Sequence, residues 1–180
     1  MAKTIEINIF DSKSVQNGIN EIKNIKKILK EVIPGNFVYE SLIWIRDRAN
    51  EYHDKRVGSF PNTINVTKHW DIVFDSSSQG KTSTIGRLIN RDKRSTFVEF
   101  GTGLKGKTLP HQKANEINYE YDVNNHNLVG WNWYNEEFDI GMKGFIGYEG
   151  KSFLYDAFLD YFYGQQYAII YRKLFDKYIK

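Results

Sequence analysis

The sequence predicts an α+β fold in which a mostly antiparallel β-sheet packs against N-terminal helices and a long C-terminal helix. Apolar residues recur at helical spacing near both ends of the chain, whereas the middle is rich in β-branched and aromatic residues separated by turn clusters. The connections in the middle are too short for the helical crossovers of a parallel sheet. With 180 residues, 41% of them hydrophobic, the chain is expected to form a single domain over residues 1–180.

Residues 1–57 are predicted to form a strand followed by two helices. Isoleucines alternate with polar residues in TIEINIF, and an Asp-Ser pair at 11–12 offers a turn or a helix cap. The first helix then carries an apolar stripe over residues 15–32, opposite a lysine-rich face. A Pro-Gly pair at 34–35 is expected to end it, and the periodic run over residues 38–52 predicts the second helix.

Residues 63–150 are predicted to form the antiparallel sheet, with a long loop over 103–117. The candidate strands are INVTKHWDIVF, KTSTIGRLI, STFVEF, INYEYDV and LVGWNWY. The glycine-rich DIGMKGFIGYEG is expected to be a loop or an irregular strand. Residues 151–180 then return to helical spacing, with Ser152 as a possible cap and Gly164 expected to kink or split the helix.

Composition excludes several classes of protein. The formal charge of +3 arises from 25 basic and 22 acidic residues, a balance too even for a dedicated binder of nucleic acid or membrane. The chain has no cysteine, which excludes disulfides, thiolate metal sites and a cysteine nucleophile. No apolar run approaches the roughly 20 residues of a membrane span. We therefore expect a soluble protein made in a cytoplasm.

The segment Gly101–Thr108 matches the sequence motif of a phosphate-binding loop: a glycine, four residues, then Gly-Lys-Thr. A functional loop needs a buried strand before it and a helix that begins at the lysine and threonine. Pro110 and the strand-like alternation after it argue against that helix. A nucleotide-binding enzyme that uses Lys107 and Thr108 is therefore kept as an alternative only.

Nothing else in the sequence predicts catalysis or a bound metal or cofactor. The four histidines lack metal-ligand spacing and are expected at the surface or in loops. Adjacent carboxylates such as Glu136 and Glu137 point to opposite faces of a strand. Trp131 and Trp133 place two indoles on one strand face, where they either pack in the core or form an aromatic patch for a protein partner. We therefore expect a protein that is not an enzyme.

Two short segments resemble a known family. FVEFGTG, Phe97–Gly103, and SFLYDAF, Ser152–Phe158, at the start of the C-terminal helix, are similar to segments of the minor tail-component and tail-completion proteins of long-tailed bacteriophages. In that family an aromatic-Val-Glu-Phe-Gly-Thr segment belongs to the sheet, and a Pro-Phe-Met type of segment introduces the closing helix. The resemblance extends loosely over the whole chain, but only these two segments are specific.

The resemblance implies a structural protein of the phage neck that completes the tail or joins head to tail. Such a protein forms a ring, expected to be a hexamer, between the head connector or stopper on one side and the tail terminator and tail tube on the other. It implies location in the virion, after assembly in the host cytoplasm, without a membrane partner. A non-specific contact of the ring lumen with DNA stays open, as does an unassigned α+β protein-binding module.

A ring needs two different patches on each subunit, and the charge pattern suggests where they lie. We expect the basic N-terminal helix, with Lys26 and Lys27, to meet an acidic aromatic hairpin that contains Trp131 and Trp133. In the glycine segment Glu99 is expected to end a strand and to be structural or at an interface. The interface residues predicted in and after that segment are Glu99, Phe100, Gly101, Thr102, Lys105 and Lys107.

Overall fold

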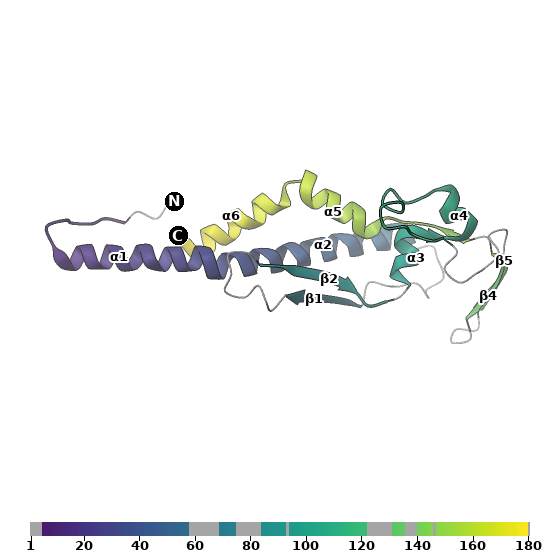
Figure 1. Cartoon of the computed structure of the whole chain (residues 1–180), viewed down its shortest axis with the longest axis horizontal. Helices are drawn as coiled ribbons and strands as arrows, with labels where there is room; N and C mark the ends of the chain where they lie inside the picture. Colours follow the sequence, from purple (N-terminus) through teal and green to yellow (C-terminus); the bar gives the residue numbers. More distant parts are fainter. Residues whose placement is uncertain are drawn as a thin grey trace. The chain divides into compact units, whose positions relative to one another are not determined.

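The protein is α+β, as its sequence predicts (Figure 1). A computed structural model describes residues 5–57, 69–74, 84–92, 94–121, 131–135, 140–145 and 147–179. The helices are α1 (Ser12–Lys27), the π-helix η1 (Ile28–Val32), α2 (Ile33–Val57), α3 (Ser95–Phe100), α4 (Gly103–Thr108), α5 (Phe153–Tyr163) and α6 (Gln166–Ile179). The strands are β1 (Trp70–Phe74), β2 (Gly86–Asn90), β3 (Gly101–Thr102), β4 (Trp131–Asn135), β5 (Ile140–Phe145) and β6 (Gly147–Glu149).

Contacts between Cα atoms divide the chain into two compact units. Unit 1 consists of Met1–Trp44, Ile72–Leu88 and Asp160–Lys180, and unit 2 of Ile45–Asp71 and Ile89–Leu159. The division falls inside α2, β1, β2 and α5 rather than in a linker. The single domain expected from the sequence stays a prediction.

The start of the chain differs from its prediction. Residues 5–10 contain no strand, and Phe10 is 94% exposed, so the predicted N-terminal strand is wrong over these residues. The segment instead runs back along α1 (Figure 1), where Ile7 lies against Gly18. The predicted cap is confirmed, because Asp11 precedes α1 and its carboxylate accepts a hydrogen bond of 3.0 Å from the Lys13 amide.

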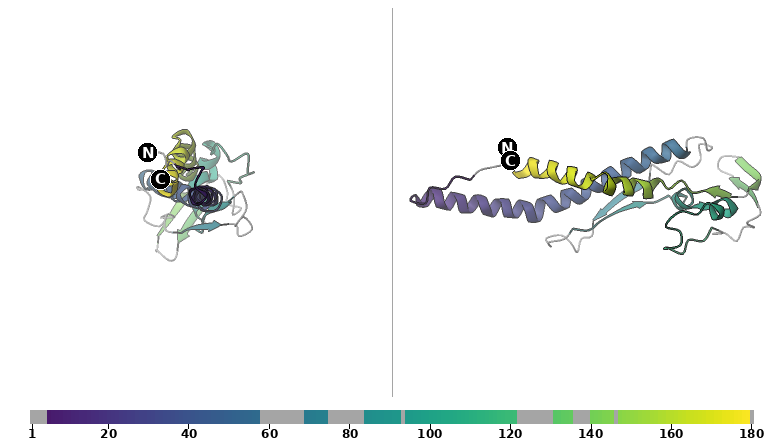
Figure 2. Two further views of the ribbon diagram at one scale, coloured as in Figure 1. Left: turned by 90° about the vertical axis from the view of Figure 1, so that its left-hand side faces the viewer. Right: turned by 90° about the horizontal axis from the view of Figure 1, so that it is seen from above.

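The predicted break at residues 34–35 does not occur. The views in Figures 1 and 2 show α1 continuing through η1 into α2. Pro34 is the second residue of α2, and the wider π-helical turn of η1, which immediately precedes it, accommodates the proline inside the continuous helix. Gly35 does not stop the helix either, because glycine in a helix costs only about 1 kcal/mol.

The described strands form three ladders, β1 with β2, β3 with β6, and β4 with β5. The β3–β6 and β4–β5 pairs are antiparallel. Antiparallel pairing agrees with the prediction, although the described strands pair in twos and do not form one broader sheet. Among the predicted strands, those ending in WDIVF, GRLI and WNWY are confirmed as β1, β2 and β4, and the glycine-rich segment contains β5 and β6.

Two further predicted strands and one predicted loop are wrong. STFVEF forms the helix α3, and residues 117–121 of INYEYDV lie in turns and irregular backbone. The loop expected over residues 103–117 begins with the helix α4. Val98 and Glu99 of α3 are both buried, so tertiary packing overrides the strand propensity of this β-branched and aromatic stretch.

The C-terminal helix is split as predicted. α5 ends at Tyr163 and α6 begins at Gln166, with Gly164 and a left-handed Gln165 (φ 53°) between them. In unit 1, the α6 residues Ile170 and Leu174 are buried, as is Ile33 of α2. In unit 2, Phe153 of α5 is 1% exposed and packs edge-on to His53 at 5.5 Å between ring centroids.

Candidate functional site

The segment Gly101–Thr108 does not have the geometry of a phosphate-binding loop. Its Gly-Lys-Thr triplet forms the last turn of α4, whereas a phosphate loop needs that triplet at the first turn of a helix. Lys107 and Thr108 therefore lie at the negative end of the helix dipole. The Thr108 hydroxyl donates to the Leu104 carbonyl at 2.8 Å. No helix follows over residues 109–121, as the sequence predicts.

Glu99 is the centre of a buried polar network in unit 2. Its carboxylate accepts hydrogen bonds from the amides of Leu154 (2.8 Å) and Tyr155 (2.9 Å), which belong to the first turn of α5. These amides have no partner within the helix, and a negative charge at this end is favourable. Glu99 is only 6% exposed. It ends no strand, contrary to prediction, but caps a helix that begins more than fifty residues later.

His111 lies beside this carboxylate. Its Nδ1 accepts a hydrogen bond of 3.0 Å from the Lys113 amide, which assigns the ring proton to Nε2. Nε2 is 3.3 Å from the Glu99 carboxylate, but the angles do not make a hydrogen bond, so the contact is electrostatic. The ring is flanked by Phe100 at 4.5 Å and Tyr155 at 5.2 Å between centroids.

The expectation that histidines lie at the surface or in loops is wrong for His53, which lies in α2 and is 4% exposed. His111 lies in irregular backbone, as expected, but is buried, at 7% exposure. His69 is exposed, and His126 lies outside the described residues. The surroundings of His111 in the sequence, LPHQKAN, contain no apolar pattern that signals burial.

Two tyrosines tie the segment after α4 to β3. The Tyr119 hydroxyl donates to the Gly101 carbonyl at 2.6 Å, and the Tyr121 hydroxyl accepts from the His111 amide at 3.1 Å. Thr102 donates through its hydroxyl to the Tyr121 carbonyl at 3.1 Å. Burial, followed by the nearby Tyr121, raises the pKa of Tyr119 to about 12. Gly101 has φ of 85°, a left-handed conformation that favours glycine at the point where α3 ends.

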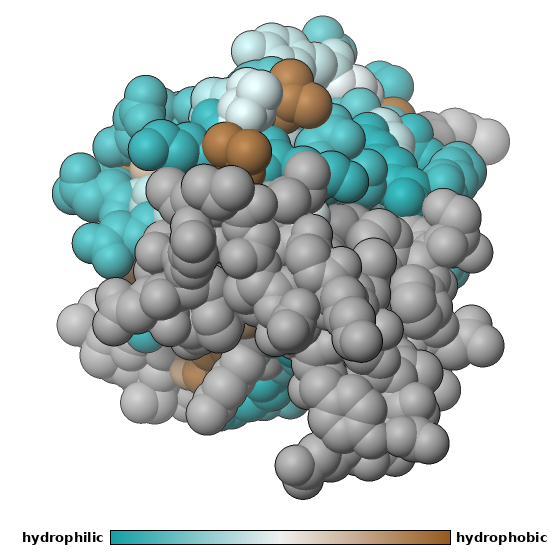
Figure 3. All heavy atoms as spheres, turned by 90° about the vertical axis from the view of Figure 1, so that its right-hand side faces the viewer, coloured by the Kyte–Doolittle hydropathy of each residue, from teal (hydrophilic) through white to brown (hydrophobic). Residues whose placement is uncertain are grey.

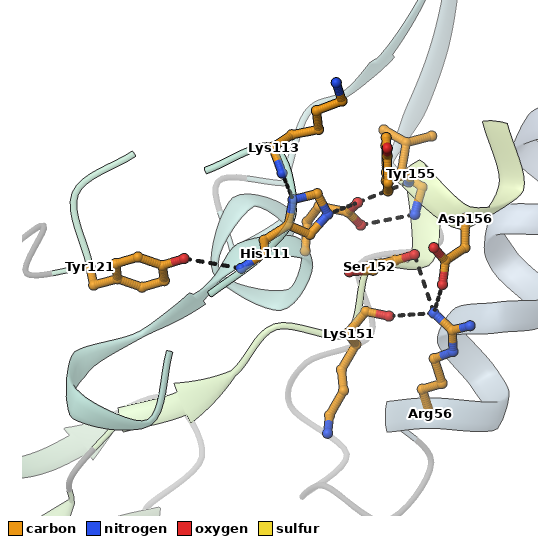
Figure 4. Close-up of polar contacts among 10 residues, drawn as sticks. Arg56, His111, Lys113, Tyr121, Lys151, Ser152, Tyr155 and Asp156 are labelled. Atoms are coloured by element: carbon orange, nitrogen blue, oxygen red, sulfur yellow. Dashed lines mark hydrogen bonds and ion pairs between the residues drawn. The ribbon is translucent and has the colours of Figure 1, made fainter. Parts of the chain in front are cut away.

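Arg56 fixes the other side of the α5 N-terminus (Figure 4). One of its terminal nitrogens donates to the carbonyls of Lys151 (2.6 Å) and Ser152 (3.2 Å) and to the carboxylate of Asp156 (2.6 Å). Ser152 has φ of 47°, an uncommon value for a residue other than glycine. Ser152, the cap expected from the sequence, therefore makes the turn before α5, while Glu99 and Arg56 hold the turn in place.

This network is suited to bracing the fold and not to chemistry on a substrate. The Glu99 and His111 side chains are 8% and 1% exposed, so a substrate has no access to them. Within the described part of the chain, no group of three or more metal-ligating side chains is close enough to hold an ion. The sequence missed His111, Arg56 and Tyr119, because their partners are remote in the chain and no local pattern marks them.

The other predicted interface residues belong to α1, α4 and β4. Lys26 and Lys27 are exposed in the last turn of α1, and Lys105 and Lys107 are exposed in the last turn of α4. Of Trp131 and Trp133 only the backbone is described: it pairs with β5, with a register shift between them. Figure 3 views the face at the α4 end, whose coloured residues are mostly hydrophilic with scattered apolar ones.

No protein-family model, curated protein or solved structure matches the chain. The helices that the structure describes include none with the length and apolar character needed to cross a membrane.

Proposed function

We propose that the protein is a structural component of a bacteriophage neck or tail, which completes the tail or joins head to tail by forming a ring. One observation carries the proposal. The two segments that resemble tail-completion proteins meet in space, because Glu99 of the first caps the helix that the second begins. Residues shared with a family for a physical reason are expected to contact one another, whereas chance similarities have no reason to do so.

The geometry favours an assembly protein over an enzyme. The ionisable pair of unit 2 is enclosed, and Gly101–Thr108 lacks the helix that a phosphate loop needs. Several large apolar side chains on helices are exposed, among them Ile22 in α1 at 53% and Phe162 in α5 at 48% exposure. Large exposed apolar groups are typical of surfaces that become covered in an assembly.

The mass of the purified protein in solution tests the proposal most directly. We expect a ring, and a hexamer is the expected species, measured by native mass spectrometry and by light scattering after size-exclusion chromatography. If the isolated chain is a monomer, ring formation must appear when the head connector or tail tube protein is added. A chain that stays monomeric with both partners contradicts the proposal.

Calorimetry with magnesium-ATP tests the alternative. The proposal expects no heat of binding for the wild-type protein or for Lys107→Ala. Tight binding by the wild type that is lost in Lys107→Ala would establish the nucleotide-binding enzyme and overturn the assembly role.

A charge reversal tests the predicted ring contact. Lys26→Glu with Lys27→Glu is expected to weaken assembly with an acidic partner surface, since it replaces attraction by repulsion. The acidic hairpin residues Glu136 and Glu137 lie outside the described residues, so their pairing with α1 stays a prediction. Unchanged ring formation in the double variant counts against it.

A further inference from the structure

α1 carries an apolar stripe that the described residues leave largely open. Gly18 is the one buried residue of the helix, with Ile7 above it. Farther along the same face, Ile19 is 40% and Ile22 53% exposed, and Leu29 at the start of η1 is 37% exposed. Isoleucine and leucine side chains left in water forgo the favourable free energy of burying their apolar surface. Burial of this face against a partner would therefore stabilise a complex.

The spacing of the stripe indicates what shape of partner fits. Val15, Ile19, Ile22, position 26 and Leu29 are separated by four, three, four and three residues. This is the spacing of a seam between two packed helices, in which successive side chains insert between those of the facing helix. A lipid surface requires an apolar face but not this alternation.

The charges of the seam lie along one edge. Lys23 and Lys30 border it on one side and Lys26 lies within it, and all three are exposed. The opposite border within α1 consists of Gly18 and Ile25. A helix that lies on an anionic bilayer is attracted through lysines on either flank, so a one-sided row has no advantage there. The row favours a partner with carboxylates along one edge.

A second copy of α1 does not supply those carboxylates. In an antiparallel pair of α1 helices, the lysine edges face each other and repel. In a parallel pair, the lysine edge faces the border formed by Gly18 and Ile25. Neither arrangement brings a row of negative charges to Lys23 and Lys30.

We infer that α1 docks an α-helix of another protein, one that carries an apolar stripe at the same spacing and a row of Asp or Glu along one edge. The inference rests on the proposed assembly role, for which it names the class of partner. The inference predicts the orientation of the partner helix as well as its affinity. Of the two possible alignments, parallel and antiparallel, only one places the carboxylates of a given partner beside Lys23, Lys26 and Lys30.

A synthetic helix tests the inference on the full-length protein. The probe is a fluorescein-labelled peptide of about three heptads, with Leu and Ile in the seam and Glu along one edge, and its matched control has Lys in place of Glu. Fluorescence anisotropy is expected to show the Glu peptide binding about tenfold more tightly than the Lys peptide. Lys23→Glu with Lys26→Glu should reverse this preference, whereas Lys105→Glu with Lys107→Glu, which changes net charge equally, should leave it unchanged.

Three results would overturn the inference. The first is equal affinity for both peptides, and the second is an equal loss in the Lys105 and Lys107 double variant, which would show unspecific attraction. The third is binding to vesicles of phosphatidylcholine with phosphatidylglycerol, and not to the peptide. Circular dichroism confirms that each variant is folded. Native mass spectrometry of the same samples reports ring formation separately. If no ring forms but the protein still prefers the Glu peptide, only the proposed function is contradicted.

Discussion

α1 and the network around Glu99 are stabilised in opposite ways. α1 follows from local spacing and from the Asp11 cap, and Gly18 is its one buried residue. The Glu99 network depends on hydrogen bonds to amides 55 and 56 residues away. Damage to α1 should therefore affect binding more than folding, and damage to the network should affect folding first.

The largest effect should come from the aromatic ring beside the network. Phe153→Ala removes a side chain that is 1% exposed and contacts His53 and Trp70, so we expect a loss of about 4 kcal/mol in the free energy of unfolding. Phe10→Ala, at 94% exposure, should change it by less than about 0.5 kcal/mol. Urea denaturation measures the free energy of unfolding of both variants. Similar losses in the two variants would contradict the difference in stabilisation between the two regions.

Removing the carboxylate should be nearly as damaging. Glu99→Ala leaves the amides of Leu154 and Tyr155 without their acceptor in a buried site, for an expected loss of about 3 kcal/mol. Glu99→Gln keeps an acceptor oxygen and should lose roughly half as much. Lys26→Ala in α1 is the matched surface control. A Glu99→Ala variant as stable as this control would show that the capping contact contributes nothing.

Tyr119→Phe sharpens the comparison through pH. At neutral pH the loss of the hydrogen bond to the Gly101 carbonyl should cost about 1 kcal/mol. Burial raises the pKa of Tyr119 from its ordinary value of 10 to about 12, so its contribution to stability is complete below pH 10 and is lost as the pH rises toward 12. The difference between wild type and variant should therefore shrink over this range. A difference that stays constant would contradict the burial of this hydroxyl.

The smallest effect, and the only stabilising one, is expected in the continuous helix. A Cβ added at Gly35 meets no atom within 4 Å, so Gly35→Ala should raise the free energy of unfolding by about 0.5–1 kcal/mol through helix propensity. Gly106→Ala is the contrasting variant, because its Cβ would lie 2.9 Å from the Gly101 carbonyl carbon. Destabilisation by Gly35→Ala would indicate a helix break that the structure lacks.

The fold class, the α1 cap and the split at Gly164 follow from the sequence because each depends on neighbouring residues. The strand predicted over STFVEF failed for the opposite reason: the burial of Val98 and Glu99 in α3 depends on distant parts of unit 2. Pro34 does not stop the helix, because the wider π-helical turn of η1 immediately precedes it and accommodates a proline inside the continuous helix.

The candidate site was predictable only in part. The sequence predicts that Glu99 is either structural or at an interface. Its role as a hydrogen-bond acceptor for the α5 amides agrees with the first of these alternatives. The partners that complete the network, Arg56 and His111, are far from any motif, and their positions are set by the tertiary fold. The exposed lysines of α1 lie on a helix surface, as predicted, whereas Lys105 and Lys107 lie in α4 and not in the predicted loop. The partners of all these lysines remain predictions.

The π-helix η1 lets the continuous helix hold one residue more than regular α-helical winding would. A π turn contains about one residue more than an α turn for about the same rotation, so a deletion within Ile28–Val32 would restore regular winding. The stripe of α1 would then keep nearly the same orientation relative to the start of α2. Chains with and without this extra residue would therefore present the same face of α1 to a partner.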